Sequence, residues 1–292
     1  MKQIKNSSKT LLINKGPVAQ RLEQYTHNVL VPGSNPGGPT SFMENKIVIS
    51  RAEETSIKFD GNFDQNSYSK NLKLALFKSL AMDTKISDEI KFMSGMSGRK
   101  YRYLINNLVS SINNPRYLEI GSWAGSTVCS ALYGNQVKAV CIDNWLKFET
   151  EEYVKKVYNT KDQKKEFEIN TKKIVTERID FKFIESDFRK VDYNHLGKFN
   201  IYCYDALHDE KSQYDGISLV QPALDDIFIL IIDDWNWAEV RKGTLEALKN
   251  LKIDIISKIE IRTTQDNNMP KIFVGQYSEW HNGYFIAVCE KK

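Results

Sequence analysis

The stretch Tyr117-Leu-Glu-Ile-Gly-Ser-Trp-Ala-Gly-Ser-Thr127 decides the fold of this 292-residue chain. An apolar run with strand character ends at Gly121, and Gly125 follows four positions later, where a helix over 126–133 is predicted. Glycines at such positions let the backbone turn tightly and approach a ligand where a side chain would clash. The free N–H groups of the helix N-terminus then face the polar end of that ligand. The stretch therefore predicts a strand-to-helix turn that forms part of a binding site.

Strands and helices alternate on both sides of this turn. Strands are predicted over 117–120, 137–142, 181–184, 199–204 and 227–232, with helices over 126–133, 150–176, 214–219 and 240–251. Strands that are apolar on both faces indicate a parallel sheet covered by helices. The last two strands, 253–262 and 284–290, have no helix between them and should pair as a long antiparallel hairpin. The predicted fold class is α/β, a Rossmann-like doubly wound, mostly parallel sheet of about seven strands with a C-terminal antiparallel hairpin.

The first 42 residues differ in composition from the rest of the chain. Four of the seven prolines precede Met43, and residues 16–40 show no apolar period, so residues 1–42 are expected to form a disordered tail. Residues 16–40 also resemble a translated transfer-RNA gene, because the T-arm sequence GGTTCGAATCC reads Gly-Ser-Asn-Pro in one frame, as in Gly33–Pro36. We favour Met43 as the biological start, and an ordinary disordered extension is the alternative.

The remaining chain is expected to contain a helical N-terminal cap over 43–112 and a ligand-binding domain over 113–292. The second segment includes a long, highly charged helical insertion at 146–178. This insertion is a candidate lid over the bound acceptor, and a solvated scaffold helix is the plainer alternative.

Composition excludes several classes of protein. The net charge is +4, from 41 basic and 37 acidic residues, which argues against a dedicated nucleic-acid binder. No apolar run approaches the length that a membrane span requires, and the N-terminus lacks a signal peptide. The four cysteines form no C-x-x-C pair, as expected of buried, reduced thiols. We therefore expect a cytoplasmic protein with no nucleic-acid or membrane partner, and the sequence leaves a homo-oligomer open.

The spacing of the glycines distinguishes between cofactors. It is G-x-x-x-G, whereas dinucleotide-binding turns that hold a pyrophosphate have G-x-G-x-x-G. The pattern E-x-G-x-x-x-G at Glu119, Gly121 and Gly125 resembles motif I of class I S-adenosyl-L-methionine (SAM) dependent methyltransferases. The resemblance implies SAM as the cofactor. The residues expected to hold it are Glu119, Gly121, Ser122, Gly125, Ser126, Asp143, Asn144 and Asp187.

Two acids after the next strands support this interpretation. Asp143 ends the second strand about 20 residues beyond the glycine turn, where an acid accepts hydrogen bonds from ribose hydroxyls in dinucleotide folds. Asp187 follows the third strand and resembles the residue that meets the adenine amino group. Each acid taken alone could be a helix N-cap or a turn residue instead.

The resemblance spans residues 95–292 and is closest to small bacterial and phage-type methyltransferases. That group carries D-x-x-H after the fourth strand and D-D after the fifth, matched here by Asp205–His208 and Asp233–Asp234. The segments Gly95-Met-Ser-Gly98 and Asp143-Asn-Trp145 also look like that group. The resemblance implies that the acceptor is a small molecule or glycan, with sugars among the suspected substrates.

Methyl transfer to a hydroxyl requires an aligned acceptor and a group that weakens its proton. His208 is the candidate base, with Asp205 and Asp233 as the other expected catalytic residues. Asp205, Asp233 and Asp234 resemble the Mg²⁺ site of metal-dependent O-methyltransferases. Metal-free use of the Asp233–Asp234 pair, as partner of the SAM amino group or of the substrate, is the alternative.

Trp235 and Trp237 lie next to these acids and either stack on a sugar or pack beneath the last helix. The overall prediction is a SAM-dependent O-methyltransferase that acts on a sugar or another small hydroxylated acceptor. A non-catalytic SAM- or nucleotide-binding module is the main rival. An NAD(P)-linked oxidoreductase is disfavoured by the glycine spacing, and a nucleic-acid methyltransferase by the balanced charge.

Overall fold

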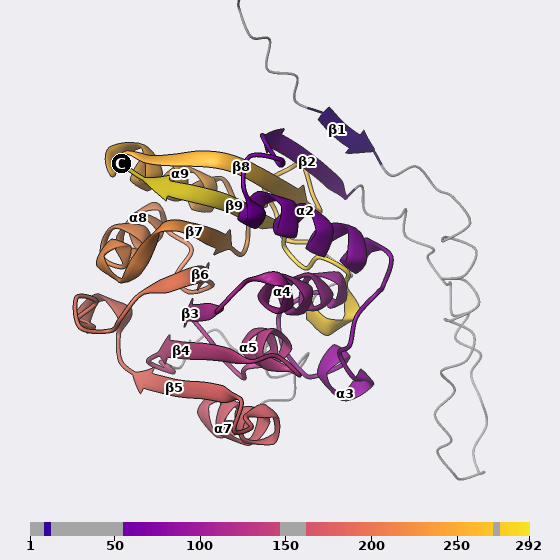
Figure 1. Cartoon of the computed structure of the whole chain (residues 1–292), viewed down its shortest axis with the longest axis vertical. Coiled ribbons are helices and arrows are strands. Elements are labelled where there is room, and N and C mark those ends of the chain that lie inside the picture. Colours follow the sequence, from indigo (N-terminus) through magenta and orange to yellow (C-terminus); the bar gives the residue numbers. More distant parts are fainter. Residues whose placement is uncertain (1–8, 13–54, 147–161, 271–274) are drawn as a thin grey trace, which may run out of the picture.

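A nine-stranded mixed sheet runs through the centre of the molecule (Figure 1). The computed structural model describes residues 9–12, 55–146, 162–270 and 275–292. The strands are β1 (Lys9–Leu12), β2 (Ser56–Gly61), β3 (Arg116–Ile120), β4 (Val137–Asp143), β5 (Ile179–Glu185), β6 (Phe199–Tyr204), β7 (Leu224–Ile232), β8 (Ile253–Arg262) and β9 (Tyr284–Lys291).

Helices connect most of these strands. The α-helices are α2 (Ser67–Leu80), α3 (Asp88–Lys91), α4 (Arg99–Ser111), α5 (Ser126–Leu132), α7 (Gln163–Ile174), α8 (Glu210–Ser218) and α9 (Ala238–Asn250). Three short 3₁₀ turns are η1 (Phe188–Lys190), η2 (Gln221–Ala223) and η3 (Gly275–Tyr277). No helix among the described residues has the length and apolar run that a membrane crossing needs.

The strand order is β1-β2-β8-β9-β7-β6-β3-β4-β5. The strands from β7 to β5 are parallel neighbours, whereas β9 lies antiparallel between β7 and β8. The predicted fold class is therefore confirmed, including the C-terminal hairpin β8–β9. An NAD-type fold would require a parallel strand where β9 lies, so the topology argues against the oxidoreductase reading.

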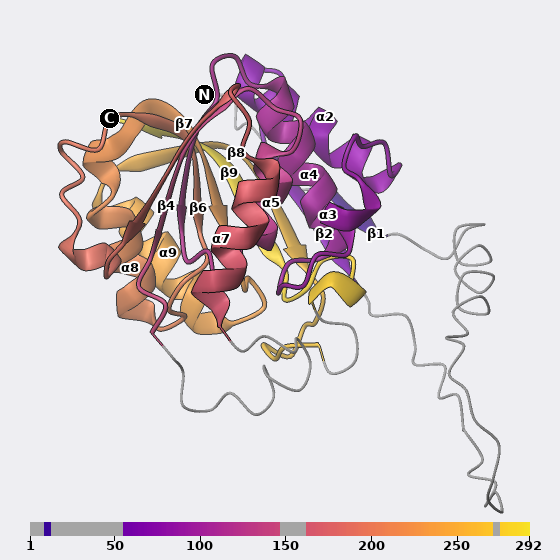
Figure 2. The same ribbon diagram turned by 90° about the horizontal axis from the view of Figure 1, so that it is seen from below.

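Helices cover both faces of the sheet, as Figure 2 shows: α8 and α9 lie on one side and α2, α4, α5 and α7 on the other. Successive strand residues alternate between the two cores. Tyr117 and Cys141 pack with the α4–α5 side, whereas Leu118 and Ile142 pack with the α8–α9 side. A strand buried on both faces favours apolar residues at successive positions, which explains the nearly continuous apolar runs.

The N-terminal part of the described chain differs from expectation in one respect. The segment predicted as a helical cap also contains β2, which pairs antiparallel with β8 and lies next to the last strand at this side of the sheet, β1. Its half-exposed residues gave no strong period, and its partner lies about 200 residues away, so local sequence patterns could not indicate it. Of the predicted N-terminal tail the structure describes only β1, whose backbone pairs with β2; the rest of residues 1–42 lies outside the described residues.

The described part of the predicted charged insertion is α7, the crossover helix between β4 and β5. Its Phe167 is fully buried in the core of the α4–α5 side. This half of the segment therefore acts as scaffold, and residues 147–161, the remainder of the candidate lid, lie outside the described residues.

Candidate functional site

The turn after β3 needs glycine at its first position. Gly121 has φ +84°, and a Cβ built there would lie 1.8 Å from the backbone oxygen of Asp205, which follows the neighbouring strand β6. The missing side chain therefore allows two strand ends to approach each other, a reason that differs from the predicted approach to a ligand. Gly125 has φ +86° and its N–H donates to Ser122 O at 2.7 Å, which closes the turn into α5.

Asp143 holds this turn from the end of β4. Its Oδ2 accepts the backbone N–H groups of Ser122 (2.8 Å) and Trp123 (2.9 Å), and its Oδ1 accepts that of Trp145 (2.8 Å). Trp145 Nε1 donates to Trp123 O at 2.9 Å, so the two turns are linked a second time. A carboxylate offers about four lone-pair positions, so Asp143 retains capacity to accept from a ligand.

A cavity of about 260 Å³ opens at the carboxyl ends of β3, β4, β5 and β6. Six of the predicted site residues line it: Gly121, Asp143, Asn144, Asp187, Asp205 and His208. The sequence analysis missed several further lining residues: Met96, Trp123, Trp145, Gln163, Phe188 and Arg189. Most of them lie one or two positions from a predicted residue, so proximity to the motifs was the signal that could have indicated them.

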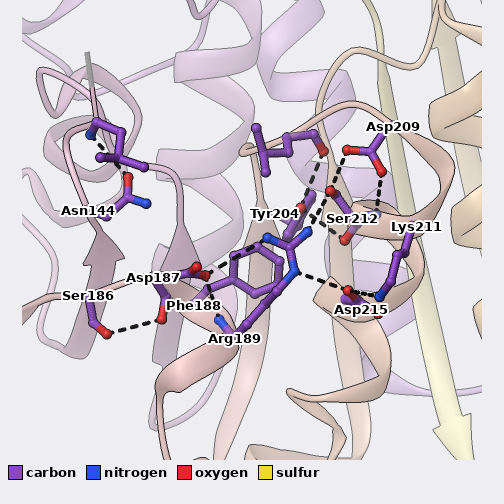
Figure 3. A network of polar contacts seen from close by, with 12 residues as sticks. Asn144, Ser186, Asp187, Phe188, Arg189, Tyr204, Asp209, Lys211, Ser212 and Asp215 are labelled. Carbon is purple, nitrogen blue, oxygen red and sulfur yellow. Dashed lines mark hydrogen bonds and ion pairs between the residues drawn. The ribbon is translucent and has the colours of Figure 1, made fainter. Parts of the chain in front are cut away.

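Asp187 both lines the cavity and caps a helical turn. It accepts the backbone N–H of Arg189 at 3.0 Å at the start of η1. Arg189 in turn donates to Asp215 Oδ2 at 3.1 Å and to Ser212 Oγ at 2.7 Å, which ties the loop after β5 to α8 (Figure 3). The N-cap role that the sequence left open is therefore present, and Asp187 is held rigidly at the rim of the cavity.

Four of the predicted cofactor residues do not line the cavity: Glu119, Ser122, Gly125 and Ser126. Ser126 is buried, and its hydroxyl lies 3.0 Å from that of Ser97 in the Gly95–Gly98 segment. Asn144, which does line the cavity, accepts the backbone N–H of Leu146 at 3.1 Å.

Glu119 is fully buried behind the turn and accepts a hydrogen bond from the Tyr117 hydroxyl. Burial raises the pKa of Glu119 to about 8. Hydrogen bonding to the side chains of Tyr117 and Ser122 opposes this rise. Glu119 and Ser122 are therefore buried polar neighbours beside the turn.

His208 and Asp234 form a close pair next to the cavity. His208 Nε2 lies 2.7 Å from Asp234 Oδ2, and the His208 ring packs edge-on against Trp237 with 4.5 Å between the ring centroids. Burial alone would lower the pKa of His208, but the Asp234 charge outweighs it and raises this pKa. Burial would raise the pKa of Asp234, and His208 instead lowers it to about 2. The pair is therefore ionic below the raised pKa of His208.

Asp205 and Asp233 are two further acids that interact electrostatically with Asp234. Burial, followed by the charge of Asp234, raises the pKa of Asp205 to about 7. Burial and the charge of Asp205 raise the pKa of Asp233 as well. A cluster of buried acids binds protons or a cation to offset this repulsion.

The structure brings together a set of potential ligands that differs from the predicted one. Atoms of Asp205, His208 and Asp234 lie within 4.8 Å of one another. Asp233, predicted as the third ligand, is not in this group. Its Oδ1 accepts the backbone N–H of Asp234 at 2.7 Å. The spacing of Asp205 and His208 in D-x-x-H was the sequence signal for the histidine.

The two tryptophans beside the acids have different surroundings. Trp235 is buried, stacks on Phe285 at 4.4 Å and donates its Nε1 to Glu260 at 3.0 Å. Trp235 therefore belongs to the core on the α8–α9 side of the sheet. Trp237 is only partly buried, and its ring lies against that of His208.

No protein-family model matches the chain, and no curated protein matches it. Among solved structures, a methyltransferase of Podospora anserina bound to SAH (S-adenosylhomocysteine) aligns with a TM-score of 0.46 and 12% identity, over 97% of this chain and 98% of that one. An O-methyltransferase from Bacillus cereus in complex with SAH aligns with a TM-score of 0.43 and 11% identity, over 92% and 97% of the two chains. Such likenesses concern the arrangement of the backbone alone.

Proposed function

We propose that the chain is a SAM-dependent O-methyltransferase that acts on a small hydroxylated acceptor, with sugars as the leading class. The observation that carries this proposal is the shared cavity. Asp143 and Asp187 line it at one end, and Asp205 and His208, the latter paired with Asp234, line it at the other. A cofactor site and a proton-accepting pair therefore meet in one cavity, as methyl transfer to a hydroxyl requires.

The cofactor would lie along the turn after β3. Asp143 would accept from the ribose hydroxyls, and Asn144 and Asp187 would border the adenine. Glu119 and Ser122, which are buried beside this turn, would face the amino-acid end. When bound, SAM supplies a methyl group on a sulfonium.

His208 would accept the proton of the acceptor hydroxyl. With Nε2–H donated to Asp234, the nitrogen that can take a proton is Nδ1. The charge of Asp234 stabilises the imidazolium that forms. Trp237, packed against the His208 ring, offers an apolar face of the kind on which sugars stack.

The cofactor assignment predicts a binding defect in Asp143→Asn. An amide at this position would turn a donor toward backbone N–H groups that need an acceptor, and would weaken the ribose contacts. We expect SAH to bind the wild-type chain with micromolar affinity by isothermal titration, and the variant at least about 100-fold more weakly, since hydrogen bonds to charged groups contribute about 1.5–3 kcal/mol each.

Asp192→Asn is the matched control, because Asp192 also accepts a backbone N–H (Asn194, 3.0 Å) but is exposed outside the cavity. It should bind SAH like the wild type. A folded wild-type chain that does not bind SAH contradicts the cofactor assignment. Binding without turnover on any hydroxylated acceptor favours the non-catalytic module.

The donor set also fits a divalent cation. Asp205, His208 and Asp234 would hold it, and the bound ion would lower the pKa of the acceptor hydroxyl. Carboxylates suit Mg²⁺, and an imidazole ligand shifts the preference toward Mn²⁺.

This cation site predicts metal-dependent stability. At pH 8, above the pKa of about 7 of Asp205, both Asp205 and Asp234 are ionised and repel each other, so a cation present at about 100 times its Kd should add about 2.7 kcal/mol to the free energy of unfolding. The effect should shrink as the pH falls below about 7, the pKa of Asp205, because protons then compete for the site. Melting temperatures with Mn²⁺, Mg²⁺ or EDTA check this, and Asp205→Asn should abolish the response. Equal melting temperatures with EDTA and with either ion would exclude the cation site.

A further inference from the structure

We infer that Asn282 is a positioning residue, which fixes the Asp234 carboxylate so that one oxygen faces His208. The inference deepens the proposed function and rests on it. Asn282 is fully buried in the turn before β9, and its Nδ2 donates to Asp234 Oδ1 at 2.6 Å. The other oxygen of Asp234 contacts His208 at 2.7 Å. The two oxygens of one carboxylate thus have one partner each, and Asn282 occupies the side away from His208.

The direction of this hydrogen bond is set by backbone groups beyond β8. The backbone N–H groups of Thr263 and Thr264 donate to Asn236 Oδ1 at 3.0 and 3.4 Å. A backbone N–H can only donate, so the oxygen of Asn236 must face them and its Nδ2 must point the other way. That Nδ2 donates to Asn282 Oδ1 at 2.9 Å.

The same logic applies to the next amide. Because Asn282 Oδ1 accepts from Asn236, its Nδ2 must turn toward Asp234, which receives a donor on Oδ1. The chain of donors therefore runs from the backbone after β8, through two buried amides, to the carboxylate. A carboxylate that receives such a donor is held in its ionised form and in one rotamer.

Asp234 needs such support because its backbone is unusual. It has φ +57°, a left-handed conformation that non-glycine residues rarely adopt, and it is the second residue after β7. Backbone hydrogen bonds brace the same junction, since Asn236 N donates to Asn282 O at 3.0 Å and Trp235 N to Gly283 O at 3.2 Å. The C-terminal hairpin thus contributes to the proposed site through Asn282.

Asn282→Asp replaces the donor in the last link of this chain with a carboxyl oxygen and places a second buried acid against Asp234. The new side chain can still accept from Asn236, but it presents an oxygen where Asp234 requires a donor. We expect kcat to fall about 10- to 100-fold, the loss typical of a supporting contact to a functional group, with the KM for SAM and the Kd for SAH within about twofold of the wild type. Asn282→Leu, which has a similar shape and no charge, should show the same split and serves if the first variant does not fold.

Ser278→Ala is the matched control. Ser278 is buried in the same turn, where its hydroxyl accepts the His281 N–H at 2.9 Å and donates to Gly275 O at 2.8 Å, but it does not contact Asp234. This variant should lower the melting temperature and leave kcat within about twofold. A parallel loss of kcat in Ser278→Ala and Asn282→Leu at matched melting temperatures would show a structural role only and overturn the inference.

A crystal structure of Asn282→Leu separates this inference from the proposed function. A chain that binds SAH but methylates no acceptor contradicts the proposed function alone. In that case an Asp234 carboxylate turned away from His208 in the variant supports the positioning role of Asn282. An Asp234–His208 contact still at 2.7 Å overturns it.

Discussion

His208→Gln is expected to lower kcat about 100- to 10,000-fold, the usual contribution of a positioned general base. A glutamine amide can still donate to Asp234, so the pair keeps its hydrogen bond, but the amide cannot take a proton at neutral pH. The loss should therefore appear in kcat, while the Kd for SAH changes little. If the side chains of Asp205, His208 and Asp234 hold a cation instead, the same variant should also weaken metal binding, because it removes the imidazole ligand.

The chain offers a matched control for this variant. His195 Nδ1 also lies 2.7 Å from a carboxylate, that of Asp192, but the pair is exposed and does not line the cavity. His195→Gln should therefore retain wild-type kcat. A His208→Gln enzyme with wild-type turnover would remove the base from the proposal and leave acceptor activation to another group.

The pH dependence follows from the shifted pKa of His208. A base must be neutral to act, and the charge of Asp234 raises the pKa of His208. The midpoint of the increase of kcat with pH should therefore lie above about 6.5, the ordinary pKa of a histidine. The effect on stability has the opposite sign. The His208–Asp234 pair stabilises the fold most below about pH 6.5, and this contribution is lost as the pH rises through the raised pKa.

Gly121→Ala should have the largest effect on stability. A methyl group there must avoid a backbone oxygen 1.8 Å away, and the φ of +84° disfavours any L side chain by a further 1–2 kcal/mol or so. Together we expect a loss of more than about 4 kcal/mol, at the upper end of single-residue effects, and a fall in melting temperature of about 10 °C or more. Loss of SAH binding should accompany it, because the two strand ends that border the cavity must separate.

Gly197→Ala separates the two causes of this effect. Gly197 has φ +101°, but a Cβ there would meet only Lys138 Nζ, at 4.0 Å. This variant should lose only the conformational part, about 1–3 kcal/mol, and keep its affinity for SAH. Equal melting temperatures for the two alanine variants would show that the approach of Asp205 to Gly121 does not restrict the turn.

Much of the fold was predictable because its signals are local. The glycine turn after β3, the apolar strands β4 to β7 and the hairpin β8–β9 all follow from runs and spacings within a few residues. Strand β2 was missed because its strand character depends on a distant partner, β8.

The sequence by itself determined the parallel strands of the sheet, its C-terminal hairpin and which acids gather at the carboxyl edge, because parallel strands bring their ends to the same place. Only the tertiary structure decided how those acids are used. It groups His208, rather than Asp233, with Asp205 and Asp234. It also engages Asp143 with the backbone of the turn and connects Asn282, near the C-terminus, to Asp234. These pairings depend on hydrogen-bond directions between segments up to 48 residues apart, which no local period encodes.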